Sequence, residues 1–141
     1  MKKALRHLRI ALPTLLLLAC SNPPEGSVDP REVNVDETMT RPVTLRAGDT
    51  VKVSLDVHMG SGSSWQLATT PPANLEFLGS AVTQPPHENN PPGVVGQREV
   101  QVFRFKALAK GDVNLEFRKA RPWEKQNPEK SFSVQLAVSA K

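Results

Sequence analysis

Val51-Lys52-Val53-Ser54-Leu55-Asp56-Val57 is the stretch that decides the fold of this 141-residue chain, because apolar and polar side chains alternate at every position. Successive side chains of a β-strand point to opposite faces, so the alternation predicts a strand with one buried and one solvated face. The same period recurs in residues 113–117 and 132–138, and residues 42–45 and 75–78 are shorter candidates. No stretch after residue 20 keeps a helical period, so the chain is predicted to be all-β.

The segment 99–107 resembles these strands in composition but changes phase within itself. Val100 and Val102 lie on one face of an ideal strand, whereas Phe103 and Phe105 lie on the other. A β-bulge adds one residue to a strand and shifts its phase. We therefore expect a bulge, or a bend between two sheets, near Val102.

Turn-forming residues separate the predicted strands. They lie at residues 47–49, at residues 109–112 and in the long proline-rich stretch 84–96. Roughly six to eight short strands at this spacing are typical of an antiparallel β-sandwich of the immunoglobulin-like type. The single cysteine excludes an internal disulfide but not this architecture. We predict one such domain over residues 33–141.

The first nineteen residues have the pattern of an export signal. Four basic residues precede an apolar stretch that is too short to anchor a chain stably across a bilayer. The segment ends in Leu17-Leu18-Ala19-Cys20, which resembles the bacterial lipobox, where the chain is cut before the cysteine and the thiol is acylated. Residues 1–19 are therefore expected to be a lipoprotein signal peptide, and Cys20 the lipidation site.

Residues 20–32 are rich in proline, glycine and charge, which predicts a lipidated, flexible tether. Ser21 follows the cysteine, as in lipoproteins of the outer membrane, so the expected location is the bacterial cell envelope, on the periplasmic side of that membrane or at its surface. Cleavage before Cys20 removes four of the eighteen Lys and Arg residues and none of the fourteen Asp and Glu. The mature chain is then close to neutral, which argues against a nucleic-acid partner.

Few residues support catalysis or metal binding. Beyond the signal the histidines are His58 and His87, and neither has a cysteine or glutamate at metal-site spacing. The serines of residues 61–64 lack the strand-to-helix elbow of hydrolase nucleophiles, so we expect neither an enzyme nor a cofactor. His58 and Met59 together offer imidazole and thioether ligands suited to copper. A periplasmic copper-binding lipoprotein is one alternative function, and a structural immunoglobulin-like lipoprotein is another.

Both tryptophans lie in turn-like segments rather than in alternating strands. Trp65 ends the small-residue run of 60–65, and Trp123 follows Arg121-Pro122. Large amphipathic rings at loop edges are typical of residues that contact a partner, although such a ring can also close the end of a sandwich core. We expect these two rings to be displayed for recognition.

Three segments, taken together, resemble the loops of the chagasin-like inhibitors of cysteine peptidases. The first is similar to the family's Asn-Pro-Thr-Thr-Gly-x-x-Trp loop, with His58-Met59 in place of Asn-Pro. The second resembles a glycine-rich loop but has Gln97 where a further glycine is common, and the third resembles the family's Arg-Pro-Trp loop. In order, the segments comprise Gly60, Ser61, Gly62, Ser63, Ser64 and Trp65; Gly93, Val94, Val95 and Gly96; and Arg121, Pro122 and Trp123.

The resemblance covers about residues 40–139 and implies a reversible, non-covalent inhibitor of papain-like cysteine peptidases. Three loops at one end of the sandwich would enter the active-site cleft as a wedge. Trp123 would anchor one rim, residues 93–96 would clamp the other, and Trp65 would pack beneath the first loop. Arg121 would bond either to the peptidase or within its own loop. We expect the inhibitor to act as a monomer.

Overall fold

Strands account for nearly all regular structure in the computed structural model of the chain, which describes residues 29–84, 99–124 and 126–140. A single 3₁₀ turn, η1 (Met59–Ser61), lies among the described residues. The all-β prediction is confirmed. The strands are β1 (Glu32–Asp36), β2 (Val43–Arg46), β3 (Thr50–Val57), β4 (Ser64–Leu67), β5 (Leu75–Thr83), β6 (Glu99–Ala107), β7 (Gly111–Ala120) and β8 (Lys130–Ser139).

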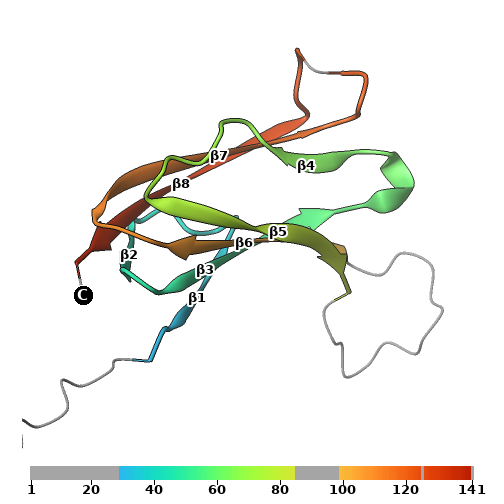
Figure 1. The fold of residues 1–141 in the computed structure, drawn as a ribbon. Helices are drawn as coiled ribbons and strands as arrows, with labels where there is room; N and C mark the ends of the chain where they lie inside the picture. The colour runs from blue at the N-terminus through green and yellow to red at the C-terminus, as the bar shows by residue number, and fades with distance from the viewer. Residues whose placement is uncertain (1–28, 85–98, 125, 141) are drawn as a thin grey trace, which may run out of the picture.

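The strands form two four-stranded sheets that pack face to face (Figure 1). One sheet has the order β1-β3-β6-β5, and the other has the order β2-β8-β7-β4. The predicted β-sandwich is confirmed, but its pairing is not antiparallel throughout, since the edge strands β1 and β2 run parallel to β3 and β8. Alternation within a strand specifies which face is buried and carries no information about which strand becomes its neighbour.

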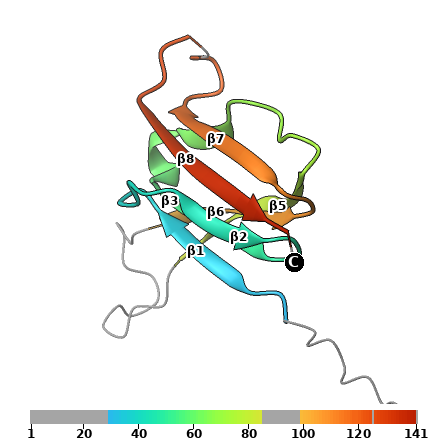
Figure 2. The same cartoon turned by 90° about the vertical axis from the view of Figure 1, so that its left-hand side faces the viewer.

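Consecutive strands reverse direction along the chain. The odd-numbered strands β1, β3, β5 and β7 run toward one end of the sandwich, and the even-numbered strands run back from it. Every connection from an odd to an even strand therefore lies at this end, which we call the loop pole. The start of β1 and the end of β8 lie at the opposite pole, from which Figure 2 views the molecule.

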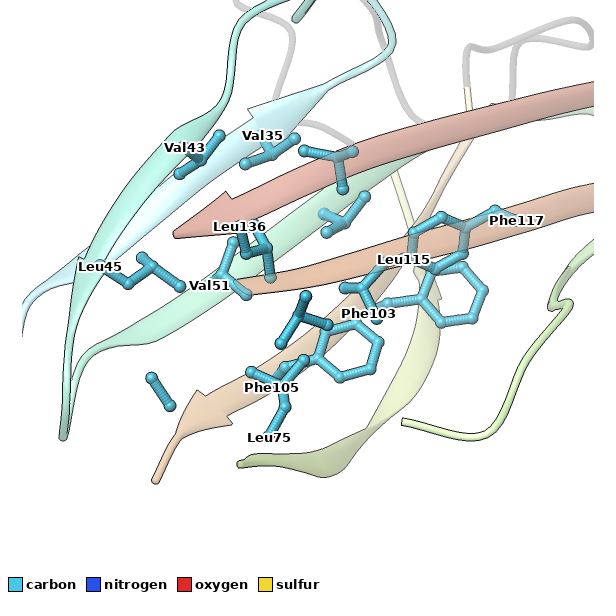
Figure 3. Close-up of a cluster of buried hydrophobic side chains, with 14 of the residues drawn as sticks. Val35, Val43, Leu45, Val51, Leu75, Phe103, Phe105, Leu115, Phe117 and Leu136 are labelled. Atoms are coloured by element: carbon cyan, nitrogen blue, oxygen red, sulfur yellow. The ribbon is translucent and has the colours of Figure 1, made fainter. Parts of the chain in front are cut away.

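The core lies between the two sheets and is built by the alternating apolar positions. The apolar side chains of β3 are all 0% exposed. Phe103 of β6 and Phe117 of β7 meet across the two sheets, with their ring centroids 4.9 Å apart. Figure 3 shows how side chains from both sheets interdigitate, among them Val35, Leu45, Val51, Phe105, Leu115 and Leu136.

The prediction of a bulge near Val102 is wrong, because the irregularity lies elsewhere in the sheet. β6 keeps an unbroken register with β3 along its length, and the irregularity lies in the neighbouring strand β5, between Phe77 and Gly79. Val102 is 8% exposed and faces the outer side of its sheet, where it lines a groove together with Lys52 and Leu78. This strand therefore buries residues of both phases without a bulge of its own.

Asp49 fixes the pole opposite the loops. Its carboxylate is 4% exposed and accepts hydrogen bonds from the backbone N–H groups of Arg31 at 3.0 Å and Arg46 at 2.9 Å. Burial acts to raise the pKa of Asp49, but those two N–H donors and the nearby arginine charges outweigh it and hold the pKa below its usual value. The ionised form therefore joins the start of the domain to the turn between β2 and β3.

Replacing Asp49 by asparagine is expected to reduce stability at neutral pH by about 2 kcal/mol. The carboxylate offers one charged oxygen to each of the two N–H donors, whereas the amide has a single, neutral oxygen acceptor. A carboxylate whose pKa is lowered by folding stabilises the protein above its unfolded pKa of about 3.9 and loses this contribution as the pH falls through the folded value. Denaturant unfolding at pH 7 and pH 3 should show the difference between wild type and variant shrinking at pH 3. An equal difference at both pH values would contradict a role for the charge.

Candidate loop surface at one end of the sandwich

The first and third predicted loops lie together at the loop pole. Residues 58–63 connect β3 to β4, and residues 121–129 connect β7 to β8 (Figure 1). Backbone pairing places their strands side by side, since Ser64 lies opposite Ala120. The predicted residues Gly93, Val94, Val95 and Gly96 lie outside the described residues. The strand ends that flank them belong to this pole, because Glu99 pairs with Val57 at the end of β3.

The first loop is shaped by its own hydrogen bonds. The carbonyl oxygen of His58 accepts from the Ser61 N–H at 3.0 Å and from Ser61 Oγ at 2.7 Å. Gly62 adopts a φ of +73°, a left-handed conformation that favours glycine. Gly60, Ser61 and Gly62 are exposed, whereas Ser63 is buried. The loop therefore presents a narrow tip of small residues that is held by hydrogen bonds within the loop.

Trp65 supports this loop from below and is not displayed. It lies in β4 rather than in a turn, and its side chain is only 2% exposed. Its indole Nε1–H donates to the backbone oxygen of Asp56 at 2.8 Å, which joins the start of β4 to the end of β3. The expectation that Trp65 faces a partner is wrong, and the expectation that it packs beneath the first loop agrees with its position.

Gln101 is a buried polar residue that sequence patterns did not single out. Its side-chain oxygen accepts from the backbone N–H of Trp65 at 2.8 Å, and its amide nitrogen donates to the Trp65 carbonyl at 2.9 Å. The side chain thus forms the hydrogen bonds that a neighbouring strand would otherwise form with the free edge of β4. It also connects the two sheets beneath the first loop. The available signal was a polar residue in phase with Phe103 and Phe105.

The third loop displays an exposed aromatic ring on a tight turn. The Glu124 N–H donates to the Arg121 carbonyl at 3.0 Å, so Pro122 and Trp123 occupy the two central turn positions. Proline favours this arrangement because its ring presets φ. Trp123 is 72% exposed, the most exposed of the large apolar side chains among the described residues. This ring is displayed as predicted.

Arg121 forms ion pairs within its own loop in the free protein. Its guanidinium lies 3.8 Å from the carboxylate of Glu124 and 3.9 Å from that of Glu129. Half-exposed ion pairs of this length contribute modestly to stability. Each pair joins Arg121, before Trp123, to a glutamate that follows it, and so restricts the turn that carries the ring.

The metal-binding alternative gains no support from this arrangement. His58 is exposed at the end of β3. Within residues 29–84, 99–124 and 126–140, no three His, Cys, Asp or Glu side chains are placed to hold a metal ion together. The same residues contain no helix of the length and hydropathy needed to cross a membrane. Cys20 and His87 lie outside the described part of the chain.

Replacing Gly60 by alanine tests whether the first loop binds a partner, without a change in the stability of the domain. A Cβ built on Gly60 meets no atom within 4 Å, so the melting temperature should stay close to wild type, as for surface changes within about 0.5 kcal/mol. If the tip enters a closely fitting cleft of a partner protein, an extra methyl group costs about 1 to 3 kcal/mol, and the affinity for that partner should fall about tenfold. The matched control is Ser133→Ala on the exposed face of β8. Unchanged affinity of the Gly60 variant would show that the tip is not inserted.

Known proteins share this arrangement of strands. The model of the chagasin family peptidase inhibitor I42 matches residues 44–138. The cysteine protease inhibitor EhICP2 from Entamoeba histolytica has a TM-score of 0.65 at 20% identity, over 77% of this chain and 96% of its own. Amebosin has a TM-score of 0.58 at 16% identity, over 78% of this chain and 99% of its own. No curated protein matches by sequence.

The likeness to EhICP2 confirms the immunoglobulin-like β-sandwich. The family match begins within β2 and ends within β8, so it includes both described loops of the loop pole. The chain therefore belongs to the chagasin family of peptidase inhibitors and is not an enzyme.

Proposed function

We propose that this protein is a reversible, non-covalent inhibitor of papain-like cysteine peptidases that occludes the active-site cleft with its loop pole. The observation that carries the proposal is the pairing of a narrow, internally bonded small-residue loop with an exposed Trp123 on the adjoining turn. EhICP2, which shares the fold, is itself a cysteine protease inhibitor. Family membership and loop geometry point to the same activity.

A papain-type cleft is a groove with an activated thiolate at its floor, and a narrow element is needed to fill it. Gly60 and Gly62 carry no side chain, so backbone of the first loop can approach the nucleophile closely. The loop blocks the cleft without offering a correctly oriented scissile bond, and is therefore not cleaved. Its internal hydrogen bonds lower the ordering entropy lost on binding.

Trp123 is the proposed anchor on one rim of the cleft. A large ring on a proline-containing turn buries much area and loses little conformational freedom when it binds. Residues 93–96 are proposed as the clamp on the opposite rim, supported by their similarity to the family's glycine-rich loop and by the position of Glu99 at the loop pole. The three contacts together would hold the first loop in the groove.

The direct test is an inhibition panel with a lipid-free chain of residues 21–141. Stoichiometric, reversible inhibition of papain or of related peptidases is expected, with no inhibition of serine peptidases. Recovery of peptidase activity on dilution distinguishes reversible from covalent inhibition. Failure to inhibit several different papain-like enzymes would overturn the proposal.

We also propose that Cys20 is lipidated and that the mature inhibitor is a monomer held at the outer membrane. The lipobox-like Leu17-Leu18-Ala19-Cys20 supports this anchor. β1 runs toward the loop pole, so the domain begins at the other end, and an anchored chain would direct its loops away from the membrane. A Cys20→Ser variant should move from the membrane to the soluble fraction and lose labelling by a palmitate analogue. Sedimentation of the lipid-free domain tests the monomer.

A further inference from the structure

Glu129 connects the first loop to the third. Its Oε1 accepts a hydrogen bond from Ser63 Oγ at 2.6 Å, between residues 66 positions apart in the chain. The same oxygen lies 3.9 Å from Nε of Arg121. The Glu129 N–H donates to the Lys119 carbonyl at 2.8 Å, which fixes the backbone where the third loop returns to β8. A single carboxylate therefore contacts both loops.

The bond to Ser63 is stronger than an ordinary surface contact. Ser63 is only 2% exposed, so its hydroxyl has left water and needs a partner inside the protein. Its partner is a carboxylate, and hydrogen bonds to an ionised acceptor are shorter and stronger than neutral ones. Few alternative positions of the two loops would give the Ser63 hydroxyl a hydrogen-bond partner.

Lys130 adds a second connection at the same return point. Its ammonium group pairs with the carboxylate of Glu37, in the connection between β1 and β2. The other oxygen of Glu37 accepts from the Asp56 N–H at 2.8 Å, and the carbonyl of Asp56 accepts from the Trp65 indole. The return of the third loop is thus tied to the base of the first loop through both sheets.

The backbone pairing of the sheets does not depend on Glu129. Its side chain is 38% exposed, and the ladders of β4 with β7 and of β7 with β8 are formed by backbone groups of other residues. Removing the carboxylate should therefore leave the sandwich folded. Its effect should fall on the spacing between the loops.

We propose that Glu129 is a positioning residue, which holds the small-residue tip and the Trp123 turn at a fixed spacing so that a peptidase meets both together. The proposal rests on the proposed inhibitory function. Two binding elements held in their bound arrangement lose less entropy on association than two independent ones. Affinity should therefore depend on this internal bond even though Glu129 need not touch the peptidase.

The first experiment measures inhibition constants for Glu129→Ala, Ser63→Ala and the double variant. Each single change should raise the inhibition constant about tenfold, and the double variant should be no weaker than either, because both changes break one bond. Glu129→Gln keeps an acceptor for Ser63 and should recover part of the affinity. The control is Glu76→Ala, an exposed glutamate of β5 at the opposite pole, which should bind as wild type. Additive effects of the two single changes, or unchanged inhibition, would overturn the proposal.

The second experiment needs no peptidase. In Glu129→Ala, amide hydrogen exchange of the free inhibitor should accelerate at the backbone N–H groups of positions 124 and 129, while the amides of β3 stay protected. An inactive wild type would refute the inhibitory function, whereas unchanged exchange in the variant would refute the link itself, so the two failures are distinguishable. Faster exchange with unchanged inhibition would show that the link does not serve binding. Ser63→Ala, which removes the donor of the same bond, supplies the comparison if Glu129→Ala does not fold.

Discussion

Trp123→Ala is expected to weaken inhibition about 30-fold or more, because truncating a central aromatic contact costs about 2 kcal/mol or more. The ring is 72% exposed in the free protein and has no place in the core, so the variant should melt within a degree or two of wild type. The loss should appear mainly as faster dissociation, since contact residues act on the off-rate more than on the on-rate. Progress-curve kinetics with papain or a related enzyme measure both rates.

Leu108→Ala is the matched control for the Trp123 prediction. Leu108 is 48% exposed in the connection between β6 and β7, which lies at the opposite pole. This variant also removes an exposed apolar side chain, yet it should inhibit as wild type. If Trp123→Ala inhibits normally, Trp123 is not an anchor and the proposed placement of the third loop fails.

Trp65→Ala is expected to have the largest effect on folding. Removing a buried tryptophan costs about 3 to 5 kcal/mol, a large part of the 5 to 15 kcal/mol that stabilise a typical domain. The substitution also removes the indole donor to Asp56 at the base of the first loop. Chemical denaturation should show a strongly lowered midpoint, and the variant is expected to be partly unfolded at 37 °C.

The milder Trp65→Phe variant tests the link between the core and the loop. It keeps much of the apolar ring but loses the hydrogen bond to Asp56, and should remain folded with a loss of about 1 kcal/mol plus a small packing defect. Its inhibition constant should rise, because the first loop loses an anchor. Phe105→Leu is the comparison, since Phe105 lies in the same core and its ring meets Phe77 and Phe117 rather than the loop. Equal inhibition by both variants would show that Trp65 acts on stability alone.

The loops are brought to one end of the sandwich by the directions of the strands, so the strands had to be predicted first. The strand that carries Val51, Val53 and Leu55, and the strands β7 and β8 of the other sheet, were predictable because a two-residue period marks a half-buried strand. The short strands β1 and β4 escaped prediction. In β4 only four residues are paired, and its tryptophan follows a run of glycine and serine that is typical of a turn.

The hydrogen-bond partners of Trp65, Gln101 and Glu129 could not be predicted from local sequence patterns. Trp65 and Trp123 occupy similar sequence surroundings, yet one is 2% exposed and the other 72%. Glu129 sits among ordinary surface residues, and nothing near it in sequence indicates a bond to Ser63. Gln101 interrupts an apolar face, and its partner lies 36 positions away.

The sequence by itself determined the all-β class, the buried faces of the long strands and the three segments that resemble inhibitory loops, because each of these depends on residues close together in the chain. Only the tertiary structure decided that the edge strands pair in parallel, that Trp65 turns inward while Trp123 stays exposed, and that one carboxylate joins two loops. These features depend on which distant residues meet when the two sheets pack. Side-chain periodicity specifies the face that a residue occupies, whereas its partner is specified by the packing of the whole domain.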